Sequence, residues 1–141
     1  MAEDRVREAS CACGQLKIRL RGEPEYVSSC ACQQCQRRTG SPYGVTAFFL
    51  AEQVVSRAGE AAQFRRTAES GNDLTFRFCP NCGSTVWWEP HGRPGRICVA
   101  WGAFADPEFP PPQRLIWTDH KPAWVGAPPG APEFPRGPTP R

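Results

Sequence analysis

The sequence lacks a long apolar run. Its first residues, MAEDRVREAS, are charged and contain no apolar centre of the kind found in a secretory signal peptide, and no stretch approaches the length of a membrane-spanning helix. We therefore expect a cytoplasmic protein without a membrane partner. In that reducing compartment, closely spaced cysteines bind metal ions more often than they form disulfides.

A continuous block of basic residues is also missing. The chain has 17 Lys and Arg against 14 Asp and Glu, but they are scattered, and nothing resembles a stripe that would follow a phosphate backbone. The short pairs Arg37-Arg38 and Arg65-Arg66 are expected to face solvent. Nucleic acid is thus not an expected partner.

Helical periodicity is scarce, whereas short alternating runs are frequent. Leu16, Ile18 and Leu20 alternate with basic residues, as expected for a half-buried strand, and only residues 33–39 suggest a short helical turn. Further β-like runs occur at 26–30, 45–50, 63–67, 73–78, 84–88, 97–104 and 114–117. These runs predict an all-β domain of short antiparallel strands over residues 1–125.

The carboxyl-terminal segment has a different composition. Residues 126–141 carry six prolines and few large apolar side chains. Because proline removes backbone donors, we expect a flexible Pro/Gly-rich tail that is disordered.

Cysteine is the residue that is present in excess, with eight in 141 residues. A CPNCG sequence at 79–83 is the most specific motif, since its proline and glycine form a tight turn that directs both thiolates to one metal ion. The other two clusters are CxC at 11–13 and CxCxxC at 30–35. Seven cysteines are therefore candidate metal ligands: Cys11, Cys13, Cys30, Cys32, Cys35, Cys79 and Cys82.

Spacing alone leaves the partner of the 79–83 turn open. It pairs either with Cys11 and Cys13 or, in the manner of a zinc ribbon, with Cys32 and Cys35. We favour the first pairing because it keeps the CxCxxC run intact as a three-thiolate site with one open position. In the alternative, a fourth ligand such as His91, His120 or Cys98 closes this site and makes it structural.

The order and spacing of these motifs over about residues 9–124 resemble the glutathione-dependent formaldehyde-activating enzyme family, which includes the centromere protein V-type domains. The resemblance implies a zinc-bearing β-tent fold with two zinc ions. It assigns the structural zinc to Cys11, Cys13, Cys79 and Cys82, and the catalytic zinc to Cys30, Cys32 and Cys35. The family often has a histidine at the position of Ala31 and another near Leu115-Ile116, so the substrate does not follow from the resemblance.

The expected activity is that of a carbon-sulfur lyase acting on a small-molecule thiol adduct such as S-hydroxymethylglutathione, with glutathione as the thiol cosubstrate. Arg37 and Arg38 are candidates for binding its carboxylates.

Two other functions are also considered. One is a non-catalytic zinc module that binds a protein or a small ligand in a cleft lined by tryptophans, with Trp87, Trp88, Trp101, Trp117 and Trp124 as candidates. The other is a methionine sulfoxide reductase-like enzyme that uses Cys98, although Ala100 replaces the asparagine usual after that cysteine.

Overall fold

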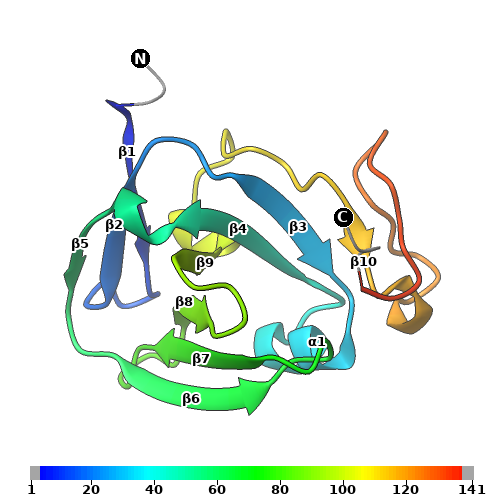
Figure 1. Cartoon of the computed structure of the whole chain (residues 1–141), viewed down its shortest axis with the longest axis horizontal. Coiled ribbons are helices and arrows are strands. Elements are labelled where there is room, and N and C mark those ends of the chain that lie inside the picture. Colours follow the sequence, from blue (N-terminus) through cyan, green and yellow to red (C-terminus); the bar gives the residue numbers. More distant parts are fainter. Residues whose placement is uncertain (1–3, 138–141) are drawn as a thin grey trace.

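The computed structural model describes residues 4–137, which contain two β-sheets and one α-helix (Figure 1). The strands are β1 (Val6–Ser10), β2 (Lys17–Arg21), β3 (Tyr26–Cys30), β4 (Gly44–Leu50), β5 (Val54–Ala58), β6 (Ala62–Thr67), β7 (Asp73–Phe78), β8 (Thr85–Pro90), β9 (Arg96–Ala100) and β10 (Leu115–Ile116). The helix is α1 (Gln33–Thr39), and three 3-10 turns are η2 (Ala51–Gln53), η3 (Trp101–Phe104) and η4 (Thr118–His120).

The smaller sheet has the strand order β1-β2-β5, and the larger has the order β10-β3-β4-β9-β8-β7-β6. Strand pairing is antiparallel except between β10 and β3. The larger sheet curves, so that β3 and β4 lie above and β6 and β7 below in Figure 1, with the smaller sheet at the left. Of the predicted all-β fold with antiparallel strands, the structure shows a mostly-β fold with one α-helix and one parallel pair, β10 with β3. The strand around 15–22 and the helical turn at 33–39 are confirmed.

The core lies between the two sheets. Ile18 and Leu20 of β2 are fully buried, whereas Arg19 and Arg21 between and beyond them are exposed, as the alternation predicts. The same cluster contains buried side chains from the larger sheet, among them Val27, Ala47, Phe49, Val86, Ile97 and Val99. Burial of each Val, Leu, Ile or Phe side chain in this cluster contributes roughly 1.5–3 kcal/mol to folding. Packing of these side chains therefore holds the two sheets together.

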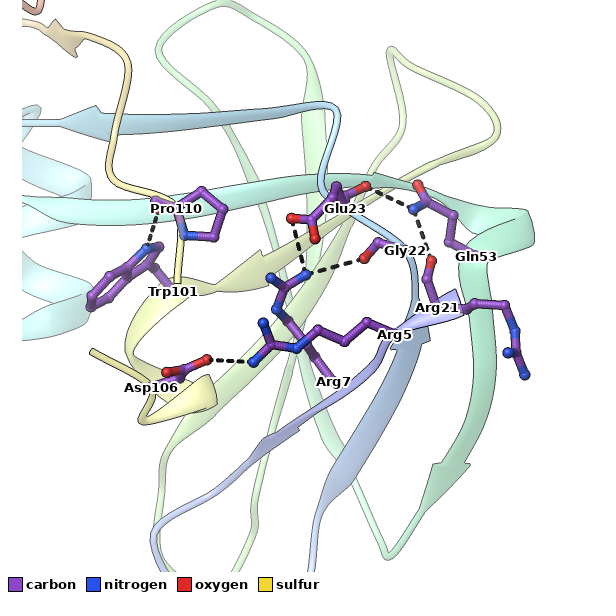
Figure 2. Close-up of polar contacts among 9 residues, drawn as sticks. All are labelled: Arg5, Arg7, Arg21, Gly22, Glu23, Gln53, Trp101, Asp106 and Pro110. Carbon is purple, nitrogen blue, oxygen red and sulfur yellow. Dashed lines mark hydrogen bonds and ion pairs between the residues drawn. The ribbon is translucent and has the colours of Figure 1, made fainter. Parts of the chain in front are cut away.

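A buried arginine fastens β1 to the segments beside it (Figure 2). Nη1 of Arg7 donates to the carbonyl of Gly22 at 3.3 Å and lies 3.1 Å from a carboxylate oxygen of Glu23. Its guanidinium also lies 4.9 Å from the centre of the Phe109 ring. With a side chain only 6% exposed, Arg7 therefore links β1 to the turn after β2 and to the segment after η3.

The segment after η3 is fixed by a second contact drawn in Figure 2. The indole Nε1 of Trp101 donates to the carbonyl of Pro110 at 2.9 Å. Trp101 also meets Phe109 edge to face, with ring centres 6.0 Å apart. The indole is thereby held in one orientation, which matters because it lines a cavity described below.

The structure does not confirm a disordered carboxyl-terminal tail for residues 126–137, which lie beside β10 (Figure 1). Leu115 N–H donates to the carbonyl of Pro132 at 3.0 Å, Phe134 N–H donates to Leu115 at 2.9 Å, and Trp117 N–H donates to Arg136 at 2.9 Å. Proline lacks a donor but keeps its carbonyl acceptor, and this segment uses those acceptors. Residues 138–141 lie outside the described part, and the domain boundary after residue 125 stays a prediction.

No helix among the described residues is both long enough and apolar enough to span a bilayer.

Replacing Phe49 by alanine should cost about 3–5 kcal/mol of folding free energy, because its side chain is fully buried. The matched control is Phe64→Ala, whose ring is 58% exposed and whose loss should cost less than about 0.5 kcal/mol. Urea unfolding with a constant excess of zinc measures both. Equal losses would contradict the placement of the core.

Candidate metal centres

Four cysteine sulfurs meet where the smaller sheet approaches the larger one. The sulfurs of Cys11, Cys13, Cys79 and Cys82 lie within 4.8 Å of one another, with 3.6 Å between Cys11 and Cys13 and 3.7 Å between Cys13 and Cys79. The first two residues follow β1 and the other two follow β7. The structure thus brings the turn at 79–83 to the CxC motif and not to Cys32 and Cys35.

Hydrogen-bond donors point at these sulfurs. Cys79 accepts from Gln15 Nε2 at 3.0 Å and from Asn81 N–H at 3.3 Å, and Cys11 accepts from Leu16 N–H at 3.2 Å. Donors of this kind stabilise thiolates over thiols. Four sulfurs with this set of donors fit a tetrahedral zinc ion.

The thiol of Cys82 ionises readily in this turn. A hydrogen bond with the Ser84 hydroxyl, 3.4 Å away, and a further one with the backbone of Ser84 lower the pKa of Cys82 to about 5. This sulfur is consequently a thiolate at neutral pH, which is the form that binds metal ions.

A second group of sulfurs forms where β3 meets α1. Cys30 ends β3, Cys32 is the N-cap of α1 and accepts from Cys35 N–H at 3.3 Å, and all three sulfurs lie within 4.8 Å of one another. The helix ends at Thr39, and Gly40 is its C-cap. The left-handed backbone of Gly40 (φ 68°) allows its N–H to donate to the Gln36 carbonyl. A strand end, a cap and a first helical turn thereby direct three thiols at one point.

These three thiols compete for protons. Hydrogen bonds with Cys30 and then Cys35 lower the pKa of Cys32 to about 2, whereas hydrogen bonding with Cys32 and Cys35 raises the pKa of Cys30 well above its usual range. Without a cation, one sulfur ionises and its neighbours stay protonated, because adjacent thiolates repel each other. A divalent cation removes that repulsion, so the three-sulfur group fits a soft metal such as zinc.

The three-sulfur group gains no fourth ligand from the described residues 4–137, since no further His, Cys, Asp or Glu joins it. His91 instead shares a 2.8 Å hydrogen bond with Thr75, and His120 stacks on Trp117 with ring centres 5.9 Å apart. The structure therefore gives no support to closure by either histidine.

Arg37 and Arg38 lie in the last turn of α1. Arg37 is exposed, while the Arg38 guanidinium lies 4.6 Å from the centre of the Trp88 ring. A Cβ atom at Gly44 would come within 2.7 Å of Nη2 of Arg38 and 3.5 Å of the Cys35 Cβ. The missing side chain at Gly44 thus lets the Arg38 guanidinium lie beside the three-sulfur group.

A cavity of about 580 Å³ extends from this arginine to the four-sulfur site. Its lining includes Arg38, Ser41, Tyr43, Cys82, Ser84 and Trp101. Hydroxyl groups and one indole therefore line a space that Cys82 of the four-sulfur group also lines. Arg38 and Gly44, which lie beside Cys35, connect this space to the three-sulfur group. Sequence reasoning missed the hydroxyl residues, because serine and tyrosine in a Gly/Pro-rich turn carry no chemical motif.

The predicted tryptophan cleft is not formed as expected. Trp87 and Trp88 are buried at 4% and 6% exposure, and Trp124 is 78% exposed. Trp101 lines the cavity just described.

The family model for the glutathione-dependent formaldehyde-activating enzyme (GFA) matches residues 6–120. The chain belongs to the GFA family. The match confirms the family resemblance of the sequence motifs, and it includes all eight cysteines. It links the chain to glutathione and formaldehyde chemistry without naming its reaction.

A crystal structure of a Rhodobacter sphaeroides protein, solved as a structural genomics target, is similar to this GFA family member. The TM-score is 0.50 at 17% sequence identity, over 90% of this chain and 98% of that chain. At this identity the likeness concerns the fold. None of the curated proteins matches this sequence.

The eighth cysteine of this GFA domain lies apart from both sulfur groups. Cys98 is 2% exposed and packs with Phe76 and Trp88. Burial raises the pKa of Cys98 to about 12, so the residue is a neutral thiol at physiological pH. This environment does not support the reductase-like hypothesis, which needs a reactive thiolate.

Cys98 should therefore resist alkylation. In native zinc-loaded protein at pH 8, iodoacetamide should leave Cys98 unlabelled for hours and label it within minutes after unfolding, as read by peptide mass spectrometry. Rapid labelling in the native state would contradict its burial.

Zinc content should separate the two sulfur groups. We expect two zinc ions per chain, one of which is lost in each of the variants Cys13→Ser and Cys35→Ser. Cys13→Ser should cost at least about 3 kcal/mol of stability, because structural zinc contributes directly to folding, while Cys35→Ser should cost less than about 1 kcal/mol. Cys13 is exposed, so its replacement leaves no core cavity. Metal analysis and urea unfolding measure the two effects, and one zinc per wild-type chain would contradict this division.

Proposed function

We propose that this chain is a zinc-dependent enzyme of the carbon-sulfur lyase type, acting on the adduct of formaldehyde with a small thiol such as glutathione. The observation that carries the proposal is the three-sulfur group, which has no fourth ligand from the described residues. Arg38 and Gly44, which lie beside Cys35, line the cavity of about 580 Å³. A closed four-cysteine site has no position for a substrate, whereas three ligands leave one. Family membership adds glutathione and formaldehyde as the chemistry to test first.

In this proposal, Cys30, Cys32 and Cys35 hold the catalytic metal, and Cys11, Cys13, Cys79 and Cys82 hold the structural one. A zinc ion at the three-sulfur group would lower the pKa of a bound substrate thiol. Cys32 at the N-cap of α1 and Cys35 in its first turn would hold the metal beside Arg38.

The reaction needs no redox step. The substrate thiolate adds to the carbonyl carbon of formaldehyde, a C–S bond forms, and the carbonyl oxygen takes up the electron pair and a proton. The reverse reaction breaks the same C–S bond.

The cavity lining has roles of its own. The hydroxyls of Ser41, Tyr43 and Ser84 line it and offer hydrogen bonds to the polar adduct. The Trp101 indole, held by its bond to Pro110, forms an apolar wall that limits access of water. Arg37 and Arg38 are assigned to the carboxylates of the thiol. A cytoplasmic location stays a prediction from the sequence.

The activity is tested by exchange NMR with ¹³C-formaldehyde and glutathione. The wild-type protein should accelerate exchange between free formaldehyde and S-hydroxymethylglutathione at least tenfold over buffer. Cys35→Ser should reduce this acceleration at least a hundredfold, because the metal loses a ligand.

The matched control is Cys98→Ala, which removes a cysteine outside both sulfur groups and should keep at least half of the activity. Full zinc occupancy with no acceleration would contradict the proposal and favour a non-catalytic zinc module.

A further inference from the structure

A second cavity, of about 410 Å³, lies between α1 and the strands β6 and β7. Three arginines line it, Arg37, Arg38 and Arg66, together with the rings of Phe64, Phe76 and Phe78. No carboxylate belongs to this lining. We refer to it as the arginine cavity.

Aromatic rings, and not acids, hold two of these guanidinium groups. The Arg66 guanidinium lies 5.0 Å from the centre of the Phe76 ring, and the Arg38 guanidinium lies 5.8 Å from the same ring. Contacts with aromatic faces orient a guanidinium without a carboxylate partner. Nη1 of Arg66 also donates to the Thr67 carbonyl at 3.3 Å, and the Arg38 side chain forms a hydrogen bond with Cys35. Two cations therefore share one aromatic platform.

Acidic groups near the arginine cavity are engaged elsewhere. Asp73 pairs with Arg65 at 2.8 Å, and Glu89 pairs with Arg77 at 3.2 Å. Among residues 4–137, Arg37, Arg38 and Arg66 have no ion pair with a carboxylate. The Nε of Arg38 is buried and has no hydrogen-bond partner there. The lining of the arginine cavity thus carries positive charge that no described carboxylate balances, and Arg38 also contacts Cys35.

Arg38 connects this cavity to the three-sulfur group. It follows Cys35 by three residues on α1, so the two side chains lie on the same helix face, and it lines both cavities. A ligand whose thiol and carboxylates are several bonds apart would place its thiol near Cys35 and its carboxylates among the guanidinium groups. The apolar Phe64 ring at the rim, 58% exposed, would cover the connecting chain.

We infer that the arginine cavity binds the carboxylates of the thiol substrate and that Arg66 is a specificity-determining residue, which favours acidic thiols over neutral ones. The inference rests on the proposed function for the identity of the ligand. Planar guanidinium groups bind carboxylates through paired hydrogen bonds, and Arg66 is the one arginine of the three that comes from the sheet and not from α1.

Direct binding tests the inference without turnover. S-methylglutathione has both carboxylates and a blocked thiol, and calorimetry with the zinc-loaded protein measures its affinity. Arg66→Gln should weaken binding at least tenfold. The control, Arg19→Gln, makes the same charge change on β2 of the other sheet and should stay within twofold of wild type.

A second ligand tests wild-type protein alone. The diethyl ester of S-methylglutathione lacks both negative carboxylates and should bind at least tenfold more weakly than the acid. This comparison decides the matter even where Arg66→Gln fails to fold. Equal affinity of acid and ester, or equal effects of the two variants, would overturn the inference.

Kinetics separate the inference from the proposed function. Arg66→Gln should raise the KM for the glutathione adduct at least tenfold, with kcat within twofold, and leave the KM for the 2-mercaptoethanol adduct unchanged. Exchange activity without a dependence on Arg66 would overturn the inference and leave the proposed function standing. Arg66-dependent binding of S-methylglutathione without exchange activity would support the carboxylate site and contradict the lyase.

Discussion

Repulsion between closely spaced thiolates is the constraint on which this structure depends. Seven cysteine sulfurs are gathered into two groups, within each of which the sulfurs lie no more than 4.8 Å apart. Such groups are stable as thiolates only with a cation among them. The four-sulfur group takes its members from the segments that follow β1 and β7, so an ion bound there would relieve the repulsion and also join the two sheets.

The two groups of sulfurs differ in how the backbone presents them. Around the four-sulfur group, turns on both sides supply N–H donors to the sulfurs. In the three-sulfur group, backbone N–H groups of the first turn of α1 donate to the Cys32 sulfur, and the Cys32 backbone donates to the Cys30 sulfur. The last turn of the same helix carries Arg37 and Arg38. The short helix α1 thus contributes Cys35 and both arginines, with Cys32 as its N-cap.

Much of this arrangement could be predicted from the sequence, because strict local patterns encode it. Alternation at Leu16, Ile18 and Leu20 predicts a half-buried strand, and the CPNCG turn predicts a metal half-site. The pairing of this turn with Cys11 and Cys13 does not follow from spacing, because distance along the sequence does not fix distance in space. The family resemblance favours this pairing. The structure supplies that distance.

Other features depend on tertiary contacts that leave no local pattern. Arg65 and Arg66 look alike in the sequence, and both are predicted to face solvent. Adjacent residues on a strand point to opposite faces, so Arg65 pairs with Asp73 while Arg66 folds over Phe76. The hydrogen bonds between residues 126–137 and β10 also leave no local pattern, because composition reflects the N–H donors that proline lacks and not the carbonyl acceptors that it keeps.

The way in which this proline-bearing segment pairs with β10 has a consequence for self-association. A sheet edge that exposes free N–H and C=O groups is a template for another chain. Here residues 132–136 cover the β10 edge, using carbonyls of Pro132 and Arg136 as acceptors. Proline cannot supply the N–H groups that a newly arriving strand would require. The segment therefore terminates the sheet and protects the folded chain against edge-to-edge aggregation on that side.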